Sequence, residues 1–230
     1  MASHHELQRA QLVERIRAST QIEDSRVLNA FARVPRHLFL PEAQNAVAYE
    51  DRALPLAEGQ TVSQPSMIAI MLSELQCEPN QRALEVGAGS GYAAAVLGQL
   101  VREVYAVELL PALAALASAN LSRSGASNVH VSLGDGSFGL AAHAPYDRIL
   151  VSAAPGEVPG ALLEQLAPGG KIAIPVGDSN TQTLLLGEKT SAGELHWRRS
   201  VPCIFVPLVT SAQAEPTVRV LNDIGLAPTR

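Results

Sequence analysis

Apolar side chains recur at helical spacing in two stretches near the N-terminus. Residues 5–18 and 24–34 each place hydrophobic residues three or four positions apart, and Pro35 ends the second stretch. Prolines and a glycine punctuate residues 35–60, which predicts a loop with one short helix near 42–47. We therefore expect two helices and a lid-like loop ahead of the main fold.

A third helix is predicted over residues 66–76. Pro65 suits the first turn of a helix, because the N–H that proline lacks would have no partner there. Ser63 stands just ahead, where a hydroxyl can accept a hydrogen bond from the first free N–H groups. We therefore expect Ser63 to cap this helix or to lie next to the cap.

From residue 82 onward, short apolar stretches alternate with helical ones. Strands are predicted at 82–86, 103–107, 129–133, 148–151 and 171–175, and helices at 91–100, 111–122 and 160–166. Two later strand-like stretches, 183–186 and 201–206, are joined by a polar segment and predict a closing antiparallel pair. The fold class is therefore α/β, with about seven mostly parallel strands flanked by helices.

No internal repeat or low-complexity linker divides the chain, so we expect a single domain over residues 1–210. Within it, residues 1–60 would form the N-terminal helices and the lid-like loop, and residues 61–210 the core. Residues 211–230 lack strong periodicity and are expected to be a loosely attached C-terminal tail.

The composition excludes several classes of protein. The chain has 230 residues, 47% of them hydrophobic, without a run of about 18 apolar residues that would suggest a membrane span. A net charge of −5 without a dense Lys/Arg run argues against nucleic-acid binding. The N-terminus lacks the layout of a secretory signal, so we expect a cytoplasmic protein. Cys77 and Cys203 read as buried apolar side chains, and no Cys/His cluster predicts a metal site.

A glycine loop is predicted between the strand at 82–86 and the helix that follows. It reads Glu85-Val86-Gly87-Ala88-Gly89-Ser90-Gly91. Glycines let the backbone turn sharply and approach a ligand, and the new helix offers free N–H groups. Glu108, followed by Leu109, stands about twenty residues on, where an acid would meet ribose hydroxyls. The pattern fits both a dinucleotide and an adenosine-containing methyl donor.

Three observations favour S-adenosylmethionine as the ligand. Glu85 beside the loop would repel a pyrophosphate but suits a cationic amino-acid moiety. Gly134-Asp135-Gly136 follows the strand at 129–133 and offers a carboxylate to an adenine amino group. No Arg or Lys lies in the loop or just after Glu108. Structural alternatives remain open: Glu85 as a satisfied strand-end acid, Asp135 as a turn former and Glu108 as a helix-capping acid.

The most specific motif precedes the glycine loop. Gly59-Gln60-Thr61-Val62-Ser63-Gln64-Pro65, with Tyr49-Glu50-Asp51 ahead of it, resembles the signature of protein-L-isoaspartate O-methyltransferases. The resemblance runs from about residue 34 to residue 208 and also takes in Gly134-Asp135-Gly136, Ala153-Ala154-Pro155 and Ile174-Pro175-Val176-Gly177. It implies a Rossmann-like S-adenosylmethionine-dependent methyltransferase fold. It also implies an enzyme that acts on isoaspartyl residues of damaged proteins and starts their repair through a succinimide.

The resemblance also implies roles for individual residues. The cofactor would be bound by Thr61, Val62, Glu85, Gly87, Ala88, Gly89, Ser90, Glu108, Leu109, Asp135 and Gly136. The substrate would meet Ser63, Gln64, Pro65 and Val209. Ser63 is the expected catalytic residue, as a donor that orients the substrate carboxylate. No general base is needed, because a carboxyl with a pKa near 4 is ionised at neutral pH.

Some positions depart from the family pattern or invite another reading. Ala88, Ala93 and Ser66 replace residues that are common in the family, which bears on affinity or substrate fit. His37, Tyr49 and Asp51 are expected to organise the loop. The sequence also leaves open a carboxyl methyltransferase for a biosynthetic peptide or small acid, a cofactor-binding sensor, and a nicotinamide dehydrogenase. We expect isoaspartyl proteins as partners, no nucleic acid or membrane, and a monomer.

Overall fold

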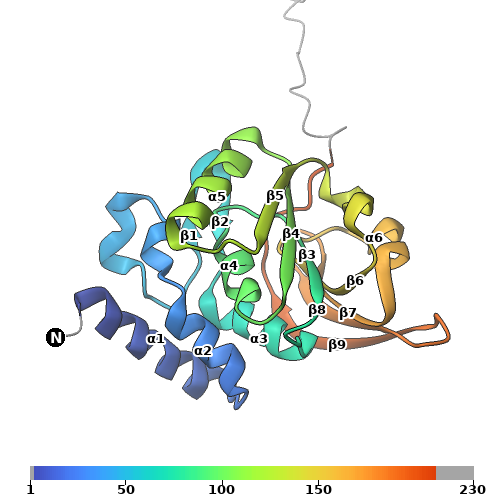
Figure 1. Cartoon of the computed structure of the whole chain (residues 1–230), viewed down its shortest axis with the longest axis horizontal. Coiled ribbons are helices and arrows are strands. Elements are labelled where there is room, and N and C mark those ends of the chain that lie inside the picture. The colour runs from blue at the N-terminus through green and yellow to red at the C-terminus, as the bar shows by residue number, and fades with distance from the viewer. Residues whose placement is uncertain (1–2, 211–230) are drawn as a thin grey trace, which may run out of the picture.

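A computed structural model of the chain describes residues 3–210 and contains a seven-stranded mixed sheet (Figure 1). The strand order is β5-β4-β3-β6-β7-β8-β9. The strands are β3 (Arg82–Val86), β4 (Glu103–Glu108), β5 (Val129–Leu133), β6 (Tyr146–Val151), β7 (Leu166–Gly177), β8 (Gln182–Lys189) and β9 (Leu195–Cys203). Strands β3 to β7 pair in parallel, and β8 and β9 add antiparallel. The predicted α/β class and its antiparallel closing pair are confirmed.

Six α-helices lie among the described residues, at or near the predicted positions. They are α1 (His4–Thr20), α2 (Ser25–Arg33), α3 (Pro65–Leu75), α4 (Tyr92–Gly98), α5 (Pro111–Ser124) and α6 (Gly160–Gln165). Short 3-10 turns are η1 (Arg36–Phe39), η2 (Glu42–Val47), η3 (Ala57–Gly59), η4 (Gly136–Phe138) and η5 (Ala141–His143). A separate two-stranded ribbon joins β1 (Leu54–Pro55) to β2 (Thr61–Val62). The short helix expected near 42–47 is therefore confirmed as η2.

The edge of the sheet differs from the prediction. Strand β9 begins at Leu195 and ends at Cys203, whereas the sequence suggested residues 201–206. Ahead of Val201 it contains the polar or charged residues His196, Arg198, Arg199 and Ser200, because β9 is an edge strand whose side chains are mostly exposed or half-buried. The ladder that pairs Gly187 with Trp197 and Glu188 with His196 holds them in register without an apolar pattern. Polar composition thus concealed the start of the strand.

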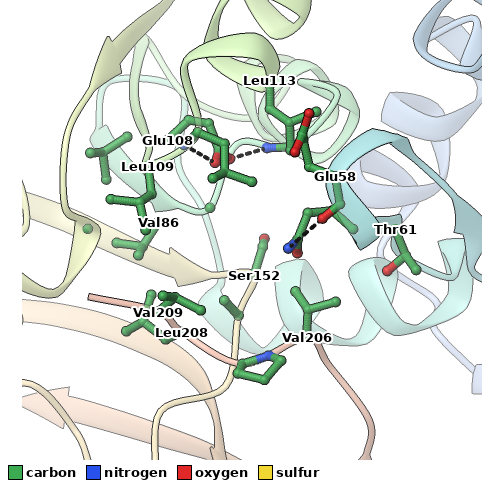
Figure 2. A pocket seen from close by; sticks show the side chains of 18 residues that line it. Glu58, Thr61, Val86, Glu108, Leu109, Leu113, Ser152, Val206, Leu208 and Val209 are labelled. Atoms are coloured by element: carbon green, nitrogen blue, oxygen red, sulfur yellow. Dashed lines mark hydrogen bonds between the residues drawn. The ribbon is translucent and has the colours of Figure 1, made fainter. Parts of the chain in front are cut away.

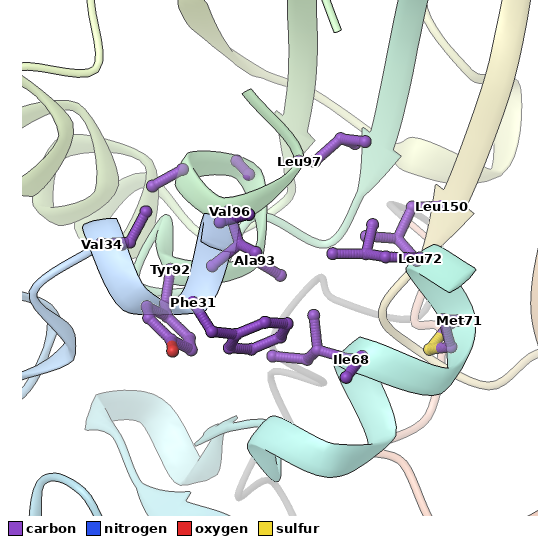
Figure 3. Close-up of a cluster of buried hydrophobic side chains, with 14 of the residues drawn as sticks. Phe31, Val34, Ile68, Met71, Leu72, Tyr92, Ala93, Val96, Leu97 and Leu150 are labelled. Atoms are coloured by element: carbon purple, nitrogen blue, oxygen red, sulfur yellow. The ribbon is translucent and has the colours of Figure 1, made fainter. Parts of the chain in front are cut away.

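The two faces of the sheet carry two separate cores. Along β3, Leu84 and Val86 point to the face covered by α6, and Ala83 points to the face covered by the other helices. Figure 3 shows part of the core on the face to which Ala83 points, where Phe31, Ile68, Leu72 and Tyr92 are buried. Because side chains alternate along a strand, Glu85 points to the same face as Ala83 and is completely buried there.

The start of α3 decides between the two positions expected for Ser63, at the cap or next to it. The N-cap is Gln64, and the helix start receives no hydrogen bond from the side chain of its N-cap. Asp51 reaches across from the preceding loop instead, and its Oδ1 accepts a hydrogen bond from the Ser66 N–H at 2.8 Å. Ser63 therefore lies next to the cap, the second of the two positions expected for it, and a carboxylate from another segment satisfies this N–H.

The structure bears on two of the features considered from the sequence, a membrane span and a metal site. Among the helices of residues 3–210, none is long and apolar enough to cross a membrane. Within the same residues, no group of three or more His, Cys, Asp or Glu side chains is placed to hold a metal ion. The expected tail at 211–230 lies outside the described residues.

Gly91 is the N-cap of α4 and provides a test of how the glycine loop packs. Its φ is +87°, and an added Cβ would lie 3.1 Å from Cγ of Leu121 on α5. Gly125 has a similar φ of +77°, but an added Cβ there would meet nothing within 4 Å. We expect Gly125→Ala to lower the free energy of unfolding by about 1 to 2 kcal/mol through backbone strain alone. Gly91→Ala should cost about 1 to 3 kcal/mol more, because the methyl group also meets α5. Urea denaturation of both variants measures the difference, and equal losses would contradict this packing account.

Candidate active site

A cavity that we call the main cavity lies at the carboxyl ends of β3, β4 and β6 (Figure 2). Its walls include Val86 and Gly87 after β3, Glu108 and Leu109 after β4, and Ser152 after β6. In an open parallel sheet, ligands bind at this edge, where the strand order reverses. The reversal occurs here between β3 and β6, since β4 and β5 extend the sheet on the other side of β3.

Glu108 is held by two backbone N–H groups from different segments. Its Oε2 accepts a hydrogen bond from Gly89 of the glycine loop at 2.8 Å, and its Oε1 accepts one from Leu110 at 3.0 Å. The residue is 7% exposed, so its carboxylate has a fixed orientation at the wall of the main cavity. Each oxygen retains a lone pair, and the carboxylate can therefore accept further hydrogen bonds from ligand hydroxyls.

The glycine loop lies between the main cavity and a smaller one. Gly87 has a φ of +86° and Gly89 a φ of +54°, a region that other residues rarely adopt. The N–H of Gly87 donates to the carbonyl of Val107 at 2.9 Å, which ties the loop to β4. The small cavity on the other side of the loop is lined by Val62, Ser63, Glu85, Ala88, Ser90 and Tyr92, among others.

Glu85 and Ser152 form a buried pair at the boundary between these cavities. The Ser152 hydroxyl donates to Oε1 of Glu85 at 2.8 Å, and Oε2 has no hydrogen-bond partner among the described residues. Burial raises the pKa of Glu85 to about 8, although the hydrogen bond from Ser152 opposes this shift. A buried carboxyl with an unpaired oxygen suits a cationic group of a ligand, because that group would satisfy the oxygen and favour ionisation.

A third, open cavity continues from Ser63 to the protein surface. This substrate cleft is lined by Ser63, Gln64 and Met67 on one side and by residues 180–182 and 202–206 on the other. Thr61 and Ser152 line all three cavities, and Ser63 lines the small cavity and the cleft. The three spaces therefore adjoin one another at Thr61 and Ser152, and the small cavity and the cleft also adjoin at Ser63.

Most of the residues predicted for the site line one of these cavities. Those in the main cavity are Thr61, Gly87, Gly89, Glu108, Leu109, Gly136 and Val209. Those in the small cavity are Thr61, Val62, Ser63, Glu85, Gly87, Ala88, Gly89 and Ser90, and those in the cleft are Thr61, Ser63 and Gln64. Val209, which was assigned to the substrate, thus lies in the main cavity instead.

Two predicted residues line none of these three spaces. Pro65 is buried in the first turn of α3. Asp135 caps η4, since its Oδ1 accepts hydrogen bonds from the N–H of Ser137 at 2.9 Å and from its hydroxyl at 2.6 Å. This supports the turn-forming role that the sequence left open, while the adjoining Gly136 lines the main cavity.

The sequence reasoning missed Ser152 and the segment 206–208. Ser152 is the first residue after β6, so it occupies the same sheet edge as Glu108, and its polar side chain after a buried strand was an available signal. The segment 206–208 reaches the cavity by pairing with Ala154, whose N–H donates to Val206 and whose carbonyl accepts from Leu208, both at 2.8 Å. No local sequence pattern predicts such an isolated bridge.

Comparison with known proteins identifies the family. The family model described as protein-L-isoaspartate(D-aspartate) O-methyltransferase matches residues 7–213. A protein-L-isoaspartate O-methyltransferase from Methanopyrus kandleri is 50% identical over 205 residues, which cover 87% of this chain and 91% of the relative. One from Aeropyrum pernix is 48% identical over 205 residues, 87% of this chain and 79% of the relative. The chain belongs to the protein-L-isoaspartate O-methyltransferase family.

Solved structures agree with this assignment. A protein-L-isoaspartate O-methyltransferase structure that is 30% identical superposes with a TM-score of 0.77, covering 86% of this chain and 65% of the longer one. A putative member from Plasmodium falciparum, in complex with S-adenosyl-L-homocysteine, has a TM-score of 0.75 at 24% identity and covers 90% of this chain and 99% of that one. The chain thus has the S-adenosylmethionine-dependent methyltransferase fold, and membership of the family makes it a protein-L-isoaspartate O-methyltransferase.

The pKa of Glu85 makes the stability of the free enzyme depend on pH. The ordinary value is 4.5 and the folded value is about 8, so between these limits the folded protein binds a proton that the unfolded chain has lost. The free energy of unfolding should therefore fall as the pH rises from about 4.5 to 8, by several kcal/mol in total from this group. In Glu85→Gln this fall should be absent, whereas the exposed control Glu78→Gln should keep it. Urea denaturation across this pH range measures the effect, and matching curves for Glu85→Gln and the wild type would contradict the assignment.

Proposed function

We propose that the protein uses S-adenosylmethionine to methylate the free α-carboxyl of L-isoaspartyl residues in damaged proteins and peptides, as a cytoplasmic monomer. The main support is the position of the Ser63 turn, which carries the family signature and lines both the small cavity and the cleft. A monomer suffices, because residues of one chain line all three cavities. The resulting ester would then react with the following amide nitrogen to give a succinimide.

The residues around the main cavity fit the proposed cofactor. The fixed carboxylate of Glu108 can accept hydrogen bonds from two ribose hydroxyls, and Val86 and Leu109 offer apolar contact to an adenine ring. The unpaired Oε2 of Glu85 would receive the cationic amino-acid end. When bound, S-adenosylmethionine supplies an electrophilic methyl group.

Ser63 has the properties of a donor that orients the acceptor carboxylate. Its hydroxyl forms no cap on α3, so it remains available at the junction of the cleft and the small cavity. A carboxylate is ionised at neutral pH and needs no general base. The enzyme must hold a carboxylate oxygen about 3 to 3.5 Å from the methyl group and remove its water, and a single well-directed hydroxyl contributes to both.

The open cleft suits a segment of a protein chain better than a small acid. Its lining includes Ala53, Gln64 and Met67, and also Ile204, whose side chain is 70% exposed. Both polar and apolar groups line it, as a peptide backbone with varied side chains requires. A small acid would leave most of this length empty.

Substrate identity tests the proposal directly. The protein should methylate isoaspartyl peptides and leave the matching aspartyl peptides almost untouched. The carboxyl of a normal aspartate would be displaced by about an ångström, which should cost on the order of a hundredfold in rate. Incubation of both peptides with labelled S-adenosylmethionine measures this, and a specific activity that is constant on dilution supports the monomer. Equal methylation of both peptides, or methylation of a small acid alone, would overturn the proposal.

Removal of the Ser63 hydroxyl tests its role. Ser63→Ala should lower kcat by about tenfold to a thousandfold while affinity for S-adenosylmethionine changes little, because a positioned donor acts on the reacting geometry. Ser118→Ala is a matched control, since that hydroxyl bonds the Ala114 carbonyl on α5. Steady-state kinetics and calorimetry separate the two effects. A kcat equal to that of the wild type in Ser63→Ala would exclude the orienting role.

A further inference from the structure

Arg36 is a completely buried cation that no feature of the proposed reaction requires. It begins η1 directly after Pro35, and its side chain is 0% exposed. Its guanidinium donates four hydrogen bonds to main-chain carbonyls. Nη1 bonds those of Ala48 at 2.9 Å and Glu50 at 3.0 Å, and Nη2 those of Arg52 at 3.1 Å and Ser63 at 3.2 Å. One side chain thus joins the 48–52 loop to the backbone of Ser63.

We propose that Arg36 is the positioning residue of this enzyme, which sets the direction of the Ser63 hydroxyl by fixing the Ser63 carbonyl. The inference rests on the function proposed above. A hydroxyl rotates about a Cα–Cβ bond whose direction depends on the backbone on either side. Arg36 restrains that backbone on the carbonyl side.

The 48–52 loop restrains the other side of the same turn. Asp51 lies between Glu50 and Arg52, whose carbonyls both accept from Arg36. From this position its Oδ1 accepts from the Ser66 N–H, and its Oδ2 accepts from Nε2 of Gln64 at 3.4 Å. The turn at 63–66 is therefore held directly by Arg36 and indirectly through the loop that Arg36 binds.

Arg36 also connects this turn to the glycine loop. Its guanidinium lies 5.5 Å from the ring centroid of Tyr92, the first residue of α4. Burial lowers the pKa of Arg36 and raises that of Tyr92. A guanidinium stays protonated in proteins, so the contact is that of a cation with a neutral ring. The planar guanidinium of Arg36 thus contacts both the Ser63 turn and the residue that follows the glycine loop.

The chemistry of arginine explains why this residue occupies the position. Burial of a charge is costly unless its donors find acceptors. Four hydrogen bonds from Nη1 and Nη2 meet this need for Arg36, and its Nε has no partner among the described residues. A guanidinium presents a rigid fork of N–H groups that can bond several carbonyls at once, whereas a lysine ammonium is a single point. A lysine here would preserve the charge but lose the simultaneous hold on four backbone carbonyls in two segments of the chain.

The effect of Arg36 should come from geometry rather than from its charge. Transfer of a methyl group from a sulfonium to a carboxylate joins a cation and an anion, so charge disappears in the transition state. A nearby positive charge would stabilise the ionised substrate more than the transition state, and would not raise kcat. Loss of Arg36 should therefore act through a misdirected Ser63.

A double-mutant cycle tests this coupling. Arg36→Lys should lower kcat at least tenfold, with KM for the isoaspartyl peptide within about threefold of the wild type. In the Ser63→Ala background, the same change should lower kcat less than twofold. Arg148→Lys is the control, because Arg148 is also buried (7% exposed) and bonds the carbonyls of Asp147 and Gln76, away from the Ser63 turn. It should destabilise the protein but leave kcat within twofold.

A measurement that does not depend on catalysis accompanies the double-mutant cycle. Amide hydrogen exchange in residues 60–67 should accelerate in Arg36→Lys and remain unchanged in Arg148→Lys, with both proteins folded at the assay temperature by circular dichroism. Hydrogen exchange also separates the two proposals. A wild-type enzyme that is inactive on isoaspartyl peptides would refute the proposed function, while the exchange rates would still report how Arg36 holds the turn. Additive losses in the cycle, a wild-type kcat in folded Arg36→Lys, unchanged exchange, or failure of Arg36→Lys to fold would each overturn the role of Arg36.

Discussion

The two hydrogen bonds that Glu108 accepts from Gly89 and Leu110 are the interactions on which the rest of the site depends. A carboxylate that is almost fully buried must find donors. Here the donors are backbone N–H groups of the glycine loop and of the start of α5. These bonds draw the segments after β3 and β4 together, so that a single surface forms at the sheet edge. The positive φ angles of Gly87 and Gly89 follow from that close approach.

A second buried acid marks the point where the strand order reverses. Glu85, the last residue but one of β3, points to the same face as Ala83 and accepts a hydrogen bond from Ser152, the first residue after β6. Glu108 has two donors for its carboxylate, whereas Glu85 has one, and burial raises the pKa of Glu85 to about 8. The two carboxyl groups therefore suit different groups of a ligand. The proposed tasks are binding of neutral hydroxyls by Glu108 and of a cationic group by Glu85.

The sequence predicted those features that depend on neighbouring residues. The strands β3 and β5 have the predicted bounds, because short apolar stretches between turns define them locally. Glu108 and the glycine loop were identified because a parallel sheet brings the carboxyl ends of its strands to one edge. The start of β9 was misplaced, because an exposed edge strand needs no apolar pattern.

Features that depend on distant contacts could not be predicted. Ser152 was missed because its role depends on β6 lying next to β3, which the order of strands along the chain does not reveal. The structure places Ser63 beside the cap, and the sequence could not show that Asp51, from across a loop, accepts the hydrogen bond of the Ser66 N–H. The carbonyls that Arg36 binds lie 12 to 27 residues away in the chain. No spacing rule relates a buried cation to such acceptors.

The most direct test of the account is a crystal structure of the enzyme with S-adenosylhomocysteine and an isoaspartyl peptide. We predict that both ribose hydroxyls bond Glu108 and that the free α-carboxylate of the isoaspartyl residue accepts a hydrogen bond from Oγ of Ser63. One oxygen of that carboxylate should face the cofactor sulfur from the cleft side. A carboxylate bound away from Ser63, or a ribose that does not touch Glu108, would contradict the account.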